Sequence, residues 1–208
     1  MNLANLKGHS YGITLTAKNH FGSFINSSRS RAPQQAGLHG NVWGARMGAY
    51  SVLTDLMAHP ELSGKTVLYM LDGLLTAPGE SVNLTAESAY WQMPPFNGGF
   101  SASLFLSQDP VALDSVGADF LVNEPNMQRR NPLLRGQSGM ENYLHEAALI
   151  GNAPSDTNYQ QVKQRRIMSL GVHEHFDNVR TKRYSRNLGR DEGIELYPIF
   201  LSSAQGKE

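Results

Sequence analysis

Residues 101–124, SASLFLSQDPVALDSVGADFLVNE, carry the clearest indications of the fold. Polar and apolar residues alternate over 101–107, which is typical of a β-strand. Asp109 and Pro110 then suit the N-cap and the first position of a helix. Apolar residues repeat at helical spacing after them until Pro125 ends the pattern. The segment therefore predicts a strand followed directly by a helix.

Other apolar stretches predict further strands. Residues 66–71 form a short apolar run that ends just before Asp72, as expected for a strand buried on both faces. Two more strands are expected over 171–176 and 194–201. No strand is expected before Lys7, so the domain is predicted to lack its N-terminal part.

Helices are expected between these strands. Apolar residues at helical spacing predict a helix over 45–58. Ser138 and Glu141 have the spacing of a capping box and predict another helix that continues to Ile150. Strands alternating with helices predict one three-layer α/β domain over 1–208, incomplete, with a mixed or mostly parallel sheet and helices on its faces.

The composition excludes several classes of protein. The 208 residues include 18 basic and 18 acidic side chains, so binding to nucleic acid through bulk charge is not expected. Without cysteine the chain forms no disulfide and ligates no iron–sulfur cluster. No run approaches the roughly 20 apolar residues of a membrane helix. The compartment stays open: cytoplasmic, or periplasmic if a longer precursor carries an export signal.

Charge is strongly segregated along this neutral chain. Residues 1–50 carry five basic and no acidic side chains, and residues 51–124 carry nine acidic side chains and one basic one. Residues 161–190 carry eight basic and two acidic side chains. Either the segments neutralise one another on packing, or they form a composite site in which basic loops hold an anion and carboxylates hold a cation.

The basic N-terminal region concentrates hydrogen-bond donors. Lys7 and Lys18 are suited to hold a phosphate or carboxylate together with Asn19. His9 and His20 lie in the same stretch and are the acid–base candidates. The alternative is a solvated loop with ordinary surface lysines.

Three aspartates are candidate ligands of a divalent metal ion. Asp72 follows a predicted strand, where ligand sites of open α/β sheets lie. Asp109 and Asp114 flank the start of the predicted helix, and Asp114 has apolar neighbours that imply burial and hence a partner. Oxygen ligands favour Mg²⁺ or Mn²⁺, whereas recruitment of His9 or His20 would favour Zn²⁺ or Fe²⁺. The alternatives are an Asp-Gly turn and a helix cap.

His173 and His175 form a His-x-His pattern. In a strand both imidazoles point to the same face, with Glu174 on the other. They are a plausible pair of metal ligands, although carbonyl or carboxylate groups could equally satisfy them.

Four stretches together resemble the DUF362 family: NLANLKGH at 2–9, AKNHFG at 17–22, DG at 72–73 and DPVALDSVGA at 109–118. The resemblance implies an α/β fold, no settled activity and a missing N-terminal strand and helix. Some relatives look like fusions to ferredoxin-type cluster domains, a role that a chain without cysteine does not share.

Two functions follow as hypotheses. The first is a site that binds a small anionic molecule, with metal-assisted catalysis by the lysines, histidines and aspartates named above. The second is a non-catalytic binding or structural module in which the same side chains cap helices and neutralise one another. An exposed sheet edge would also favour a homo-oligomer.

Overall fold

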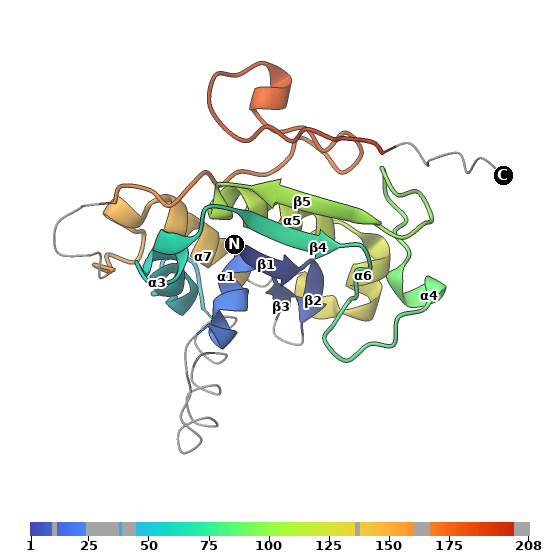
Figure 1. Ribbon diagram of the computed structural model, residues 1–208, viewed down its shortest axis with the longest axis horizontal. Helices are drawn as coiled ribbons and strands as arrows, with labels where there is room; N and C mark the ends of the chain where they lie inside the picture. Colours follow the sequence, from blue (N-terminus) through green and yellow to red (C-terminus); the bar gives the residue numbers. More distant parts are fainter. Residues whose placement is uncertain (10–11, 24–37, 39–44, 136–137, 160–166, 202–208) are drawn as a thin grey trace.

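The computed structural model describes residues 1–9, 12–23, 38, 45–135, 138–159 and 167–201 (Figure 1). Its strands are β1 (Asn2–Asn5), β2 (Lys7–His9), β3 (Gly12–Thr14), β4 (Tyr69–Gly73) and β5 (Ser103–Ser107). Its α-helices are α1 (Thr16–Asn19), α3 (Val52–Ala58), α4 (Ala86–Ala89), α5 (Pro110–Val122), α6 (Pro125–Arg130) and α7 (Ser138–Ala148). The predicted α/β class is confirmed.

A mixed three-stranded sheet, in the order β1-β4-β5, forms the centre of the fold. β1 pairs parallel to β4 and β5 pairs antiparallel to it. The mixed sheet is therefore as predicted, but the expectation that no strand precedes Lys7 is wrong, because β1 lies there. β2 and β3 form a separate antiparallel hairpin.

Helix α5 supports the inner face of this sheet. Its N-cap is Asp109, whose Oδ1 accepts from the Ala112 N–H at 2.8 Å, as the sequence predicts. Midway along α5, Gly117 lets the helix approach the sheet closely. A Cβ added there would lie 2.8 Å from side-chain atoms of both Leu15 and Leu71. Close packing without a side chain thus fixes the distance between helix and sheet.

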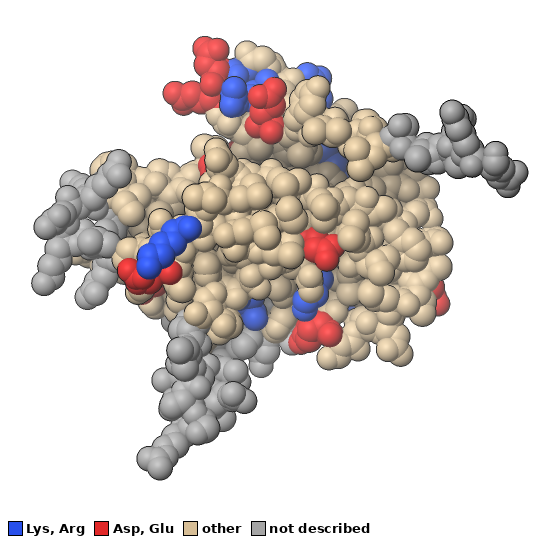
Figure 2. All heavy atoms as spheres, in the orientation of Figure 1, with Lys and Arg blue, Asp and Glu red and all other residues tan. Residues whose placement is uncertain are grey.

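The opposite face of the sheet is only partly covered in the described residues. Leu3, Leu104 and Leu106 are 49%, 49% and 54% exposed on it, and Met70 joins Leu3 to Leu106 in register. In the same orientation as Figure 1, Figure 2 shows a largely uncharged surface over β4 and β5. The described helices therefore cover one face of the sheet and leave an apolar strip on the other.

Several predicted elements have different boundaries. The helix expected over 45–58 begins only at Val52, and α7 ends at Ala148, before a 3₁₀ turn at Ile150–Asn152. None of the helices in the described ranges combines the length and the hydropathy needed to cross a bilayer.

The strands expected over 171–176 and 194–201 do not form. Residues 171–196, called the C-terminal arm below, pass beside α5 without regular strand structure (Figure 1). The N–H groups of Val172 and Phe176 donate to the carboxylates of Asp109 and Asp119 on that helix, at 2.9 and 3.0 Å. Carboxylate side chains thus accept the backbone hydrogen bonds that the carbonyl groups of a neighbouring strand would accept in a sheet.

A candidate metal centre between α7 and the C-terminal arm

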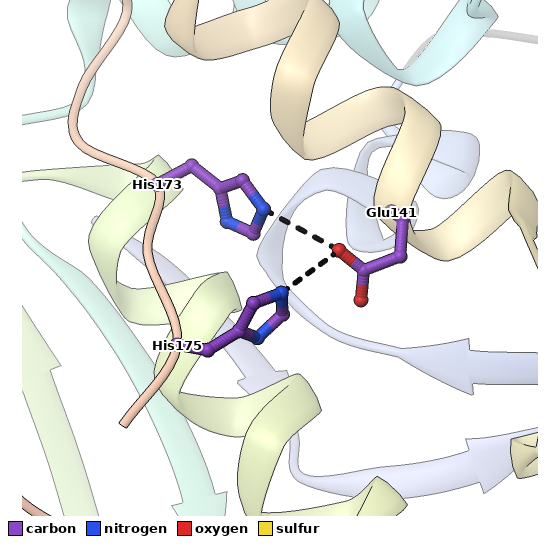
Figure 3. Close-up of side chains that lie close together, drawn as sticks. All are labelled: Glu141, His173 and His175. Atoms are coloured by element: carbon purple, nitrogen blue, oxygen red, sulfur yellow. Dashed lines mark ion pairs between the residues drawn. The ribbon is translucent and has the colours of Figure 1, made fainter. Parts of the chain in front are cut away.

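Three side chains from two distant segments converge beside α5. His173 and His175 extend from the C-terminal arm, and Glu141 extends from the first turn of α7 (Figure 3). The Nε2 atoms of the two imidazoles lie 3.4 and 3.2 Å from the same carboxylate atom, Glu141 Oε2. Both ring nitrogens are thereby directed at one point.

The other nitrogen of His173 fixes the tautomer of its ring. The Ser115 hydroxyl donates to the Val111 carbonyl at 2.8 Å, and Ser115 Oγ lies 2.8 Å from His173 Nδ1. Because the hydroxyl hydrogen is already used, Nδ1–H of His173 must donate to Ser115 Oγ. The Nε2 atom of this ring is thereby left facing Glu141.

His175 is oriented in the same way by a carboxylate. Its Nδ1 lies 2.7 Å from Asp119 Oδ1. A carboxylate accepts hydrogen bonds, so Nδ1–H donates and Nε2 again faces Glu141. Asp119 itself is buried, and its Oδ2 accepts from Phe176 N–H and from the Tyr184 hydroxyl, each at 3.0 Å. The carboxylate that orients the ring is therefore held firmly.

These distances suit a bound cation. The three ligand atoms lie within 4.8 Å of one another, and no other three His, Asp or Glu side chains of the described residues come together this closely. Two atoms that each bind a tetrahedral zinc ion at about 2.1 Å lie about 3.4 Å apart. Imidazole rings held through Nδ1–H by a carboxylate or hydroxyl are the usual arrangement around a histidine-ligated metal.

The same group shifts its own acid–base properties. Burial raises the pKa of Glu141, but the neighbouring His173 and His175 outweigh this effect and hold the pKa well below its usual range. Hydrogen bonds to Asp119 and Glu141 raise the pKa of His175 to about 10. Without a metal ion, His175 thus stays protonated between the carboxylates of Asp119 and Glu141.

A third imidazole borders the cluster. His145 lies four residues after Glu141 on α7, and its ring centroid is 4.6 Å from that of His173. Burial lowers the pKa of His145, and the nearby His173 lowers it further. His145 is therefore a neutral imidazole beside the cluster and adds no positive charge to it.

The predicted site residues lie elsewhere, and Asp114 is the most deeply buried of them. Its Oδ1 accepts from the N–H and the hydroxyl of Thr16 at 2.8 and 2.7 Å, and its Oδ2 accepts from Ala17 N–H at 3.0 Å. The Tyr143 hydroxyl donates to Oδ2 at 3.3 Å. Burial raises the pKa of Asp114 to about 6, and the donors oppose this shift. Asp114 therefore caps α1 and joins it to α5 and α7.

Asp72 and Asp109 also make local bonds. Asp72 Oδ1 accepts from Leu74 N–H at 3.0 Å in a turn after β4, and Asp109 both caps α5 and binds the arm at Val172. The structure does not gather Asp72, Asp109 and Asp114 into one group within the described ranges. Their predicted role as metal ligands stays a prediction.

Lys7 and Lys18 do lie near each other. Burial lowers the pKa of both, and the charge of Lys7 contributes to lowering the pKa of Lys18 to about 8. Glu80 opposes the shift at each lysine, and His9 Nε2 lies 4.0 Å from Glu80 Oε1. Glu80 also lines an open depression of about 270 Å³ with Pro78, Arg130 and Asn131. The structure thus gathers Lys7, Lys18 and His9 around an acid that the sequence did not single out.

His20 and Asn19 serve the packing of α1 against β1. The Asn19 amide donates to Asn2 Oδ1 at 2.7 Å and to the Leu3 carbonyl at 3.0 Å. His20 is buried, with Nε2 3.1 Å from Asn2 Nδ2 and 3.0 Å from Ser63 Oγ. Burial lowers the pKa of His20, so the ring stays neutral. Both side chains make structural contacts in the described residues.

Sequence reasoning found two of the three members of this cluster. The His-x-His pattern was visible, whereas Glu141 was assigned to a helix cap and Asp119 to no role. Ser115 and Asp119 are four residues apart and lie on one face of α5. Two side chains at alternate positions of an extended segment, such as His173 and His175, are separated by a similar distance. This spacing is the indication in the sequence that could have connected Ser115 and Asp119 with the two imidazoles.

No family model matches the chain, and neither a curated protein nor a solved structure is similar to it. The resemblance to the DUF362 family therefore stays a prediction.

Proposed function

We propose that this protein binds one divalent transition-metal ion through Glu141, His173 and His175. The observation that carries the proposal is the orientation of the two imidazoles. Ser115 and Asp119 hold the Nδ1–H groups, so that both Nε2 atoms face the same carboxylate oxygen at 3.4 and 3.2 Å. A single proton can join only one of these nitrogens to the carboxylate, whereas one metal ion joins both.

Two imidazoles and one carboxylate are a ligand set suited to Zn²⁺ or Fe²⁺ rather than to Mg²⁺ or Mn²⁺. Three protein ligands leave at least one coordination position for water or for an exogenous ligand. The His173 side chain is 4% exposed, whereas those of Glu141 and His175 are 37% and 53% exposed. The open position thus faces solvent, where the ion would act as a Lewis acid toward a bound oxygen atom.

Metal titration of chelator-treated protein tests this proposal. We expect isothermal titration calorimetry with Zn²⁺ to give one site per chain, and Co²⁺ to give the visible absorption of a nitrogen- and oxygen-ligated ion. Glu141→Gln and His173→Ala should each abolish tight binding. His59→Ala removes an exposed imidazole outside the cluster and should leave the stoichiometry at one. Equal binding by wild type and Glu141→Gln would refute the assignment.

A second candidate function, binding of a small anion, is favoured by Lys7 and Lys18. Both ammonium groups are half-buried, and the charge of Lys7 lowers the pKa of Lys18. Glu80 is the acidic residue whose charge raises the pKa of both lysines. A dianion placed between the lysines would relieve their repulsion. His9 Nε2 lies 4.0 Å from Glu80 Oε1, and His9 is the acid–base candidate of this region.

Sulfate is a suitable probe because it stays dianionic across the working pH range. We expect Lys7→Met to weaken sulfate binding about tenfold, as for loss of one charged hydrogen bond. Lys65→Met is the matched control, because Lys65 forms an ion pair with Glu61 on another part of the surface. Equal affinities in the two variants would exclude the site.

The exposed edge of β5 supports the predicted homo-oligomer. β5 is at one end of the sheet order and its sequence, Ser-Leu-Phe-Leu-Ser, reads the same in both directions. Two copies paired antiparallel about Phe105 would bring each Leu104 opposite the Leu106 of the other copy. The strand contains no charged residue that would prevent such pairing.

A further inference from the structure

We infer that the metal ion fastens the C-terminal arm to the body of the protein, so that metal occupancy controls whether the arm is docked. This inference rests on the proposed metal binding and adds a role for it. The ligands come from both parts, since Glu141 belongs to α7 and the two imidazoles belong to the arm. An ion at this site is therefore a cross-link between them.

Hydrogen bonds within the arm hold its residues together. Glu174, between the two imidazoles, turns the other way and accepts from the N–H groups of Ser185 (at 3.2 Å) and Ile194. Asp177 accepts from the Thr181 hydroxyl at 2.6 Å and from Arg183 N–H at 2.9 Å. These bonds lie within the arm and would survive its separation from α5.

The arm is attached to the body by apolar packing and by side-chain hydrogen bonds. Tyr184 and Ile194 are buried in the main hydrophobic core, and Phe176 and Leu196 pack against it. The polar part of the attachment consists of separate bonds to the N-cap and side chains of α5: Asp109 accepts from Val172, Ser115 from His173, and Asp119 from His175, Phe176 and Tyr184. No regular backbone ladder joins the arm to a strand in the described residues. A segment without ladder hydrogen bonds opens more readily than a strand held in a sheet, and a metal cross-link would oppose that opening.

Lys182 provides a built-in reporter of arm docking. It is 7% exposed although it is a lysine. Its Nζ lies 5.3 Å from the ring centroid of Phe120 on α5 and 5.6 Å from that of Phe176 in the arm. A protease that cleaves after lysine must therefore lift Lys182 away from α5 before it can cut there. Lys65, with a side chain 67% exposed, is available whether or not the arm is docked.

The experiment is limited digestion with a lysine-specific endoproteinase, with Zn²⁺ or with a chelator, followed by mass spectrometry. If opening is fast compared with cleavage, a ligand that binds only the docked form slows cutting by the factor 1 + [metal]/Kd. We expect cleavage after Lys182 to slow about a hundredfold at a free Zn²⁺ concentration of a hundred times Kd. Cleavage after Lys65 in the same sample should not change.

Glu141→Gln is the matched variant, because it removes a ligand on the body and leaves the bonds between the arm and α5 in place. Its rate of cleavage after Lys182 should be the same with Zn²⁺ and with the chelator. If calorimetry finds one tight Zn²⁺ site in the wild type and cleavage after Lys182 is unaffected, the fastening role is wrong and metal binding stands. If no tight site is found, the proposed function fails and this inference fails with it.

Discussion

At the scale of single residues, Asp114 shows how a buried carboxylate is satisfied by donors that are remote in sequence. Its two carboxylate oxygens accept hydrogen bonds from Thr16, Ala17 and Tyr143. Asp114→Asn would place an amide donor against at least one of these donors. We expect the free energy of unfolding in urea to fall by about 1 to 3 kcal/mol. Asp72→Asn is the control, since an amide oxygen can accept from Leu74 N–H equally well, and a similar loss there would contradict this account.

The titration of Lys18 gives a second prediction at this scale. Burial and the charge of Lys7 lower its pKa to about 8. A group with a lowered pKa loses its positive charge as the pH rises through that value, so sulfate affinity should decrease above about pH 8. Lys7→Met removes the repulsion and should move the midpoint to higher pH. Sulfate titrations from pH 6 to 10 measure both midpoints, and a pH-independent affinity would exclude Lys18 as the anion-binding group.

Residue-level prediction from sequence was limited by distance along the chain. The apolar neighbours of Asp114 indicated a buried carboxylate that needs partners, which is correct. They could not indicate which partners, because the backbone donors are 97 and 98 residues away. For the same reason the two imidazoles were recognisable as a pair, while Glu141 was not recognisable as the third member.

At the scale of elements, α5 was predictable because its determinants are local. Asp109, Pro110 and the apolar spacing mark its start and its buried face. β1 was missed because four residues carry too little pattern, and its partner β4 lies more than sixty residues later. The arm was expected to contain strands because its residues suit extended structure, but its N–H groups bond to side chains instead.

Gly117 makes the contact between α5 and the sheet testable. In Gly117→Ala the new methyl group would lie 2.8 Å from Leu15 and from Leu71, both fully buried. We expect the free energy of unfolding, measured in urea, to fall by about 1 to 3 kcal/mol because of overpacking. This loss should exceed the gain of about 1 kcal/mol from the higher helix propensity of alanine relative to glycine. Gly22→Ala is the control, because no described atom lies within 4 Å of its added Cβ. An unchanged or higher stability of Gly117→Ala would show that the sheet can move to accommodate the methyl group.

At the scale of the whole molecule, the edge strand β5 should govern self-association. Leu106 is 54% exposed on the edge strand, so Leu106→Lys should leave the fold intact and place a charge in the antiparallel pairing. We expect light scattering to show a mass that rises with concentration for the wild type and stays monomeric for Leu106→Lys. Val67→Lys alters another exposed apolar residue outside the strands and should behave as the wild type does. A monomeric wild type at every concentration would end this proposal.

The arm is attached to α5 by individual bonds to carboxylate and hydroxyl groups rather than by a repeating ladder. In a ladder, one shift of register alters every side chain that follows. Here each anchor is a separate side-chain contact, so a substitution at one of them does not change the register of the rest. Single substitutions can therefore weaken or strengthen the hold on this segment in small, separate steps.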